Sequence, residues 1–241
     1  IEDIWDEDRK EVIRQTNQYL FEKYLGDIQC TEGKEIFDEN EKNIEFEVKQ
    51  PFTILSENYT SNTYNILIDY LYSCNLDEYN GVIITHGSDT LSYTSAMVGM
   101  IMRDTQIPIL LTAADYPLSD EKSNGLSNFS ACVEFIKSNL CNGVFTAYGE
   151  KGHTLIYVST RICEADPVTD SFISCGNAVI VEVIDNELCK INNPLISLLK
   201  NKNNRLFNEK PVIENDILII KTYPNQHYNR YNIENLKAVV I

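Results

Sequence analysis

The stretch "GVIITHGSDTLSYTS" at residues 81–95 joins an apolar segment to a helical pattern through a short polar turn. Residues 82–85 are apolar or β-branched, which favours a buried strand, and residues 90–103 have the spacing of a helix. Proteins of the α/β class place binding and catalytic groups where such a strand ends and the next helix begins. The stretch therefore predicts an α/β fold with a candidate site in the turn His-Gly-Ser-Asp-Thr, residues 86–90.

The rest of the chain extends this pattern. A strand candidate at 107–112 is followed by a helix candidate that ends near residue 140. This alternation predicts βαβ units, and so a mostly parallel sheet flanked by helices. Three strand candidates with short links between 143 and 183 predict hairpins in the latter part of the sheet.

Other segments suggest how the chain is divided into domains. Helical spacing over residues 1–30 predicts a helix, and "FTIL" at 52–55 predicts a short strand. The asparagine- and lysine-rich segment 191–212 indicates a linker. We therefore expect a large domain over residues 1–190, this linker, and over 213–241 the beginning of a smaller α/β domain.

Composition and charge narrow the class of protein. Of the 241 residues, 43% are hydrophobic and 23% are charged, which is typical of a globular protein. The formal net charge of -16 repels phosphate groups, so we expect neither nucleic acid nor an anionic membrane as a partner. No apolar run approaches the length of a membrane span, and no signal peptide pattern is present.

Cysteines and histidines give no indication of a metal site. The seven cysteines are scattered without a C-x-x-C pair, which favours reduced thiols and a cytoplasmic location. Zinc ligands have a characteristic spacing, which the three histidines lack: His86, His153 and His227. The sequence therefore predicts no bound metal.

The turn at residues 86–90 has two interpretations. In the functional one, Ser88 is a nucleophile or holds a water, Asp89 binds an ammonium group or orients a base, and Gly87 allows close backbone approach. The positive end of the following helix would favour a substrate carboxylate or an oxyanion. In the structural one, Asp89 and Thr90 are favoured helix caps, and the turn needs a glycine. Both interpretations are open on these residues alone.

Three stretches in a fixed order carry a resemblance to a known family. "ILSENYT" (54–60), "HGSDTLSYTSAMV" (86–98) and "ILLTAADYPLSDEKSNGLSNFSACVEFI" (109–136) resemble motifs of the asparaginase/glutaminase family, which includes the bacterial-type L-asparaginases. The likeness extends over about residues 52–172, and "DILIIKTYP" (216–224) resembles the start of the family's small carboxyl-terminal domain. The family motif "TGGTI" is absent and would precede Ile1, so we expect a chain that is truncated at both ends.

The resemblance implies a chemistry and a set of site residues. The family hydrolyses an amide through a threonine acyl-enzyme, without a cofactor, in homodimers or homotetramers. Ser88 takes the place of a family threonine, and Asp89 that of the acid that binds the substrate ammonium group. The other implied substrate contacts are the α-carboxylate ligand Ser56, the polar residue Glu57, the turn residue Gly87, and the backbone carbonyl of Ala114.

Departures from the family pattern leave several functions open. The lysine that supports the family threonine would fall within 159–172, where either Glu164 or Cys163 takes its place, depending on the register. The predicted function is hydrolysis of L-asparagine, or a related amide, to the acid and ammonia. The alternatives are an altered or non-catalytic amino-acid-binding protein and an ammonia-generating subunit of a tRNA-dependent amidotransferase.

Overall fold

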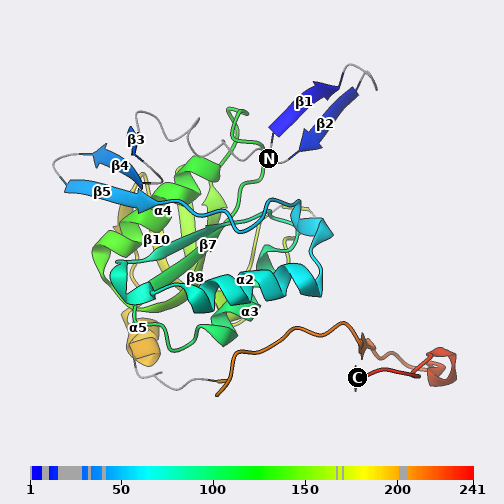
Figure 1. Ribbon diagram of the computed structural model, residues 1–241. Coiled ribbons are helices and arrows are strands. Elements are labelled where there is room, and N and C mark those ends of the chain that lie inside the picture. The colour runs from blue at the N-terminus through cyan, green and yellow to red at the C-terminus, as the bar shows by residue number, and fades with distance from the viewer. Residues whose placement is uncertain are drawn as a thin grey trace.

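A computed structural model describes residues 2–6, 11–15, 29–31, 34–39, 42–166, 168–169, 171–200 and 206–241. Its centre is a six-stranded sheet with helices on both faces (Figure 1). The strand order across the sheet is β11-β10-β9-β8-β7-β6. These strands are β6 (Val82–Thr85), β7 (Pro108–Thr112), β8 (Gly143–Glu150), β9 (His153–Val158), β10 (Val179–Ile184) and β11 (Glu187–Cys189). The helices are α2 (Ser61–Ser73), α3 (Leu91–Ile101), α4 (Gly125–Ser138) and α5 (Asn193–Lys200).

The sheet changes from parallel to antiparallel at β8. Strands β6, β7 and β8 are parallel and are connected through α3 and α4, which confirms the predicted βαβ units. From β8 to β11 each strand pairs antiparallel with the next, as the short links predicted. Thr85 of β6 is in register with Thr112 of β7, so these two strands end at the same edge.

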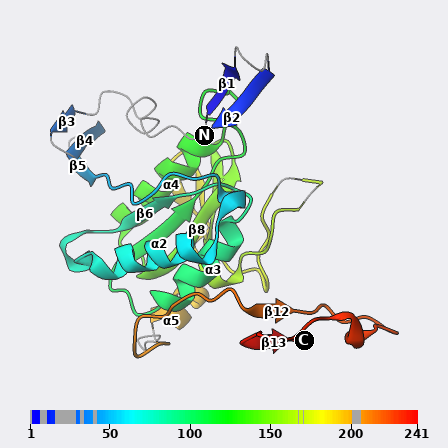
Figure 2. The same cartoon turned by 45° about the vertical axis from the view of Figure 1, so that its right-hand side comes forward.

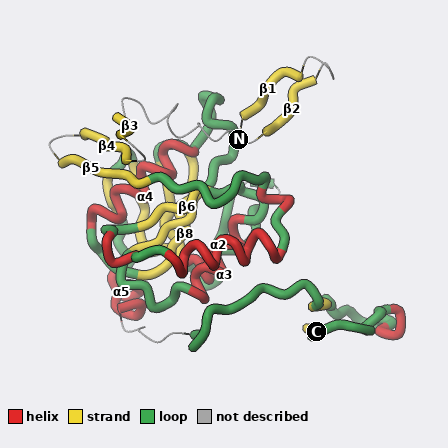
Figure 3. The backbone as a smooth tube through the Cα atoms, viewed as in Figure 1, coloured by secondary structure: helices red, strands yellow, loops and turns green. Residues whose placement is uncertain are grey.

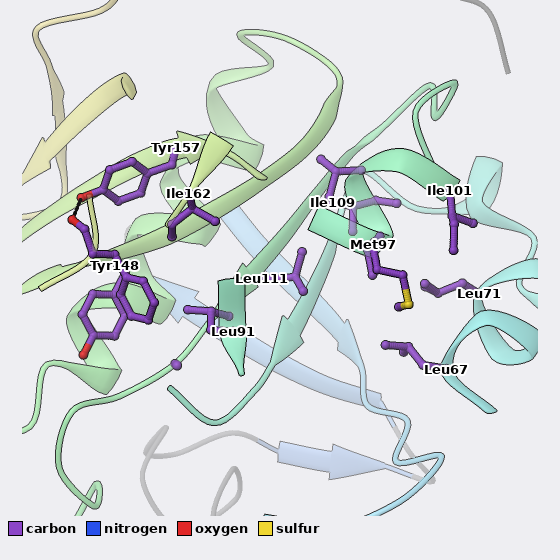
Figure 4. Close-up of a cluster of buried hydrophobic side chains, with 14 of the residues drawn as sticks. Leu67, Leu71, Leu91, Met97, Ile101, Ile109, Leu111, Tyr148, Tyr157 and Ile162 are labelled. Atoms are coloured by element: carbon purple, nitrogen blue, oxygen red, sulfur yellow. Dashed lines mark hydrogen bonds between the residues drawn. The ribbon is translucent and has the colours of Figure 1, made fainter. Parts of the chain in front are cut away.

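Alternate residues of the strands face two different hydrophobic clusters. Ile109 and Leu111 of β7 belong to the cluster that includes α2 and α3, whereas Leu110 between them belongs to the cluster with α4 and α5. Figure 4 shows Leu111 close to Leu91 at the start of α3. Because both faces of the sheet are covered, β7 is buried along its whole length, and all its residues before Thr112 are apolar. This packing anchors the first turn of α3 against the end of the sheet.

Buried hydroxyls on the α3 side of the sheet are satisfied by one another. Thr146 of β8 is 2.9 Å from Ser95 of α3 and 2.9 Å from Ser159, the first residue of the 3-10 helix η3 (Ser159–Arg161). All three side chains are fully buried. Mutual hydrogen bonds remove the penalty of burying unpaired hydroxyls, so this cluster ties α3 to the chain that leads to Glu164.

Two predictions for the first part of the chain are wrong. The "FTIL" segment 52–55 is not a strand; it is followed by the 3-10 helix η1 (Ser56–Asn58). Within the predicted amino-terminal helix, β1 (Glu2–Asp6) and β2 (Glu11–Gln15) pair as an antiparallel hairpin, and residues 1, 7–10 and 16–28 lie outside the described residues. A separate antiparallel sheet contains β3 (Gln29–Thr31), β4 (Lys34–Glu39) and β5 (Lys42–Glu47).

The segment predicted as a linker contains a packed helix. Residues 193–200 form α5, and its Ile196 is buried in the cluster with α4. After residue 206 the chain runs mostly as loop (Figure 3). It then forms the parallel pair β12 (Ile217–Ile219) and β13 (Ala238–Val240), which Figure 2 shows away from the central sheet.

Leu111→Ala tests how strongly the end of β7 depends on this packing. Leu111 is 0% exposed, so its truncation leaves a cavity and should lower the free energy of unfolding by about 2–5 kcal/mol. Urea denaturation measures the change. Met100→Ala on the exposed side of α3 is the matched control and should change stability by less than about 0.5 kcal/mol. Equal stability of the two variants would contradict the packing described.

Candidate active site

The candidate site lies at the carboxyl edge shared by β6 and β7. The hydrogen-bond ladder continues one residue past β6, because the His86 N–H donates to the Thr112 carbonyl at 2.8 Å. The chain then leaves the sheet at Gly87 and enters α3 at Leu91. The turn between them is therefore fixed at one end by the sheet and at the other by a helix whose first residue is fully buried.

Ser56 is brought to this turn from a distant part of the chain. Its hydroxyl donates to a carboxylate oxygen of Asp89 at 3.4 Å, although the two residues are 33 positions apart. The hydroxyl of Thr90 donates to the Ser56 carbonyl at 3.0 Å. Ser56 is only 2% exposed, whereas Asp89 is exposed, so the pair connects the buried side of the site to its open side.

Ser56 approaches the turn so closely that position 87 must be a glycine. A Cβ atom added at position 87 would lie 2.4 Å from the Ser56 Oγ and 2.8 Å from the Ser56 Cβ. Atoms at such distances overlap, so only glycine allows the turn to pass this close. The sequence prediction that Gly87 permits close backbone approach agrees with this geometry, and the approaching group is the Ser56 side chain.

Helix capping does not account for Asp89 and Thr90. Thr90 occupies the N-cap position of α3, yet its side chain makes no capping hydrogen bond. Its hydroxyl donates to Ser56 instead, and the Asp89 carboxylate accepts from Ser56. Both side chains therefore serve the contact with the segment at residue 56, and neither acts as a helix cap.

His86 lies beneath the turn with three neighbours. Its Nδ1 is 2.7 Å from the Gly87 carbonyl oxygen, and its Nε2 is 2.9 Å from the Thr94 hydroxyl. The Tyr59 ring packs edge-on against the imidazole, with 4.8 Å between the ring centroids. Burial lowers the pKa of His86 and outweighs the opposing effects of the Gly87 carbonyl and the Asp89 charge. The ring is therefore neutral at neutral pH.

Buried amides hold the loop that follows β7. The Asn128 side chain donates to the Ala113 carbonyl at 3.0 Å and accepts from Thr154 at 3.0 Å. Asn124 donates to the Gly149 carbonyl at 2.7 Å and accepts from the Asp115 N–H at 3.0 Å. These bonds fix the backbone on both sides of Ala114, the residue whose carbonyl is predicted to face the substrate amide.

Two of the predicted site residues, Ser88 and Glu57, have side chains without a hydrogen-bond partner in the described part of the chain. Ser88 is half-buried, and among the residues that the structure describes its hydroxyl has no hydrogen-bond partner. Glu57 is exposed on η1, next to Ser56. Its carboxylate forms no hydrogen bond or ion pair within the described part of the chain. An unpaired hydroxyl beside the Ser56–Asp89 pair remains available to a ligand.

Glu164 and Cys163 both lie along α3. They line an open cleft of about 470 Å³ together with Ser92, Tyr93, Ala96 and Ile162. The Tyr93 hydroxyl donates to the Glu164 carboxylate, and this hydrogen bond raises the pKa of Tyr93. No hydrogen bond joins Glu164 to Ser88 or Asp89 in the described structure. Tyr93 is therefore the partner that fixes this acid.

Three side chains that shape the site were not found from the sequence: Tyr59, Thr90 as a ligand of Ser56, and Thr94. Thr90 and Thr94 are one helical turn apart and so lie on the same face of α3, and this spacing can be recognised in the sequence. Tyr59 carried no such signal, because its contact with His86 depends on how η1 packs against the turn.

Neither a metal site nor a membrane-spanning helix is found in the described part of the chain. Its residues contain no group of three or more histidine, cysteine, aspartate or glutamate side chains that could hold a metal ion. Among the helices that the structure describes, none has the length and apolar character needed to cross a membrane.

Comparison with known proteins places the chain in a family. A family model described as "Asparaginase, N-terminal" matches residues 19–195, which is more than half of the chain. The chain belongs to the asparaginase family. This agrees with the resemblance carried by the three stretches of sequence that surround the site.

Several relatives and solved structures are similar to parts of this chain. L-asparaginase of Thermococcus kodakarensis is 34% identical over 86 residues, which are 36% of this chain and 25% of that protein. A glutamyl-tRNA(Gln) amidotransferase subunit from Methanobrevibacter smithii is 26% identical over 202 residues, which are 81% of this chain and 45% of that protein. The structure of the thermostable L-asparaginase from Thermococcus kodakarensis matches with a TM-score of 0.56 at 22% identity, over 72% of this chain and 50% of that one.

A further structure shares the fold. The probable cytoplasmic L-asparaginase from Campylobacter jejuni matches with a TM-score of 0.57 at 18% identity, over 74% of this chain and 56% of that one. These likenesses confirm the α/β fold. In these four comparisons the match covers between 25% and 56% of the other protein, so the chain spans about half of its relatives' length or less.

Gly87→Ala tests the contact between the turn and Ser56. The added methyl group overlaps Ser56, so it should displace the hydroxyl from Asp89 and destabilise the protein by about 1–3 kcal/mol in urea denaturation. Ser56→Gly in the same chain removes the overlapping atoms. The double variant should therefore recover most of the stability lost by Gly87→Ala, and a single variant as stable as the wild type would contradict the close approach.

Proposed function

We propose that the protein hydrolyses L-asparagine, or a closely related amino-acid amide, to the acid and ammonia at the turn between β6 and α3. The observation that supports this most directly is the hydrogen-bonded pair of Ser56 and Asp89 beside the Ser88 hydroxyl, which has no partner among the residues described. A carboxylate is the natural partner of the substrate ammonium group, and a hydroxyl donates well to the substrate carboxylate. Family membership and the match to L-asparaginases support the same activity.

The proposed chemistry is acyl transfer. The oxygen of a hydroxyl adds to the amide carbonyl carbon, its proton passes to the nitrogen, and the carbon–nitrogen bond breaks so that ammonia leaves. Water then hydrolyses the resulting ester, which releases the acid and restores the hydroxyl. Asp89 and Ser56 hold the amino-acid end of the substrate, and Ser88 acts next to the amide. In this proposal the Ala114 carbonyl faces the amide nitrogen; support comes from the amides of Asn124 and Asn128, which hold the loop on both sides of Ala114.

Partners and location are part of the same proposal. The substrate is a small amino-acid amide, and the net charge of -16 disfavours direct contact with nucleic acid or an anionic membrane. The six cysteines whose side chains the structure describes are all free, which fits a cytoplasmic protein. We also propose a homodimer or homotetramer that works without a cofactor.

Ammonia supply to a tRNA-dependent amidotransferase is the second candidate function. One observation favours it: the amidotransferase relative from Methanobrevibacter smithii aligns over 202 residues, compared with 86 for the L-asparaginase relative. Both functions use the same amide hydrolysis. Ammonia release from L-asparagine that needs no second protein supports the first, and release that appears only with a charged tRNA and a partner protein supports the second.

Asp89→Asn is the direct test of substrate recognition. Loss of the charge on a carboxylate that holds an ammonium group costs about 1.5–3 kcal/mol, so the dissociation constant for L-aspartate should rise about 10- to 100-fold. Calorimetry measures binding, and ammonia release from L-asparagine measures the reaction.

The matched control for this experiment is Asp77→Asn, an exposed acid on the 3-10 helix η2 (Leu76–Glu78). It makes the same change of charge and should leave affinity and ammonia release unaltered. Neither variant should melt far from the wild type, because Asp89 does not cap α3. Unchanged affinity in Asp89→Asn would remove the central support for the proposed function.

A further inference from the structure

The contacts of His86 define which ring nitrogen carries the proton. The Gly87 carbonyl oxygen can only accept a hydrogen bond, so the Nδ1 atom 2.7 Å away must donate. In the neutral ring the Nε2 atom then accepts, and the Thr94 hydroxyl 2.9 Å away donates to it. Thr94 is fully buried on α3, so the imidazole is held from both ends.

The hydrogen bond to Gly87 has a consequence for Ser88. The Gly87 carbonyl and the Ser88 N–H belong to one planar trans peptide, so they point in opposite directions. Holding the carbonyl oxygen against the imidazole therefore fixes the Ser88 N–H on the side away from the ring. This N–H has no acceptor among the described residues. A glycine peptide rotates more freely than others, so an outside restraint has a large effect at this position.

We propose that His86, in its neutral Nδ1–H form, is a positioning residue that orients the Gly87–Ser88 peptide, and with it Ser88, toward the amino-acid substrate. The proposal rests on the function proposed above and adds a residue to which that function assigned no role. His86 acts through the peptide and does not touch the substrate. The Tyr59 ring keeps the imidazole in place from the other side.

Protonation of the imidazole would leave its hydrogen bond to Gly87 in place and change its contact with Thr94. The groups around the imidazole are the Thr94 hydroxyl, the Tyr59 ring, and the Asp89 carboxylate, whose charge raises the pKa of His86. Burial raises the pKa of Tyr59 to about 12. Protonation turns Nε2 into a donor and forces the Thr94 hydroxyl to rotate and accept. Burial lowers the pKa of His86 from its ordinary value of 6.5, so the ring in the folded protein is mostly neutral at pH 6.5 and becomes protonated only as the pH falls through this lowered pKa.

Two variants at position 86 distinguish the effect of the Nδ1–H donor from the effect of the aromatic ring. His86→Phe keeps an aromatic ring against Tyr59 but removes the donor to Gly87. His86→Asn removes the ring and keeps an N–H near the place of Nδ1. If orientation matters, His86→Phe should weaken L-aspartate binding about fivefold, the worth of one hydrogen bond, and His86→Asn should remain within about twofold of the wild type.

NMR gives a readout that needs no substrate. In the wild type the Ser88 amide resonance should titrate together with the His86 ring nitrogens, and in His86→Asn this titration should disappear. A Ser88 amide that ignores the His86 titration overturns the proposal. Equal loss of affinity in both variants, in step with their melting temperatures, also overturns it, since only packing would then matter. If the wild type neither binds L-aspartate nor releases ammonia, the proposed function fails, and the NMR titration alone decides the role of His86.

Discussion

The contact between Ser56 and the turn at Gly87–Asp89 is the constraint on which the candidate site depends. Two segments that are 33 residues apart meet there through the hydroxyl of Ser56 and the carboxylate of Asp89. The approach is possible only because position 87 has no side chain. The sheet provides the fixed reference, since β6 and β7 end in register and Leu91 is buried directly after the turn. Disturbing any of these elements would move the hydroxyl and the carboxylate relative to each other.

The polar groups of the turn fall into two sets. His86 and Thr90 have protein partners, and these partners fix the backbone. Ser88 has a free hydroxyl among the described residues, and Asp89 is exposed with a single long hydrogen bond from Ser56. The first set makes the turn rigid and the second remains available to a ligand. Such a division is what binding a small polar substrate requires, because a preorganised site loses less entropy when the ligand arrives.

Strong periodicity made the central elements predictable. β6, α3, β7 and α4 follow clear strand or helix patterns, and the hydroxyl-rich turn between β6 and α3 identified Gly87, Ser88 and Asp89. The prediction failed for 52–55, where four residues with strand character have no partner strand, because a strand exists only as part of a ladder. Helix α5 was missed since the asparagine and lysine content of its surroundings suggested a linker.

Tertiary packing decided the rest of the site. The place of Ser56 beside Asp89 followed from the family resemblance, whereas the Tyr59–His86 contact depends on how η1 is seated and has no local signature. The register of 159–172 was ambiguous on sequence alone. The structure places Cys163 and Glu164 on one cleft and gives Glu164 a partner, Tyr93, that no spacing rule would have suggested.

A crystal structure of the protein with L-aspartate tests the central claim most directly. We expect the ligand at the turn between β6 and α3, with its ammonium group on the Asp89 carboxylate and its α-carboxylate on the Ser56 hydroxyl. We also expect Ser88 next to the side-chain carboxylate of the ligand, where the amide of asparagine would be. Ligand bound elsewhere, or an empty turn at a saturating concentration of L-aspartate, would contradict this claim.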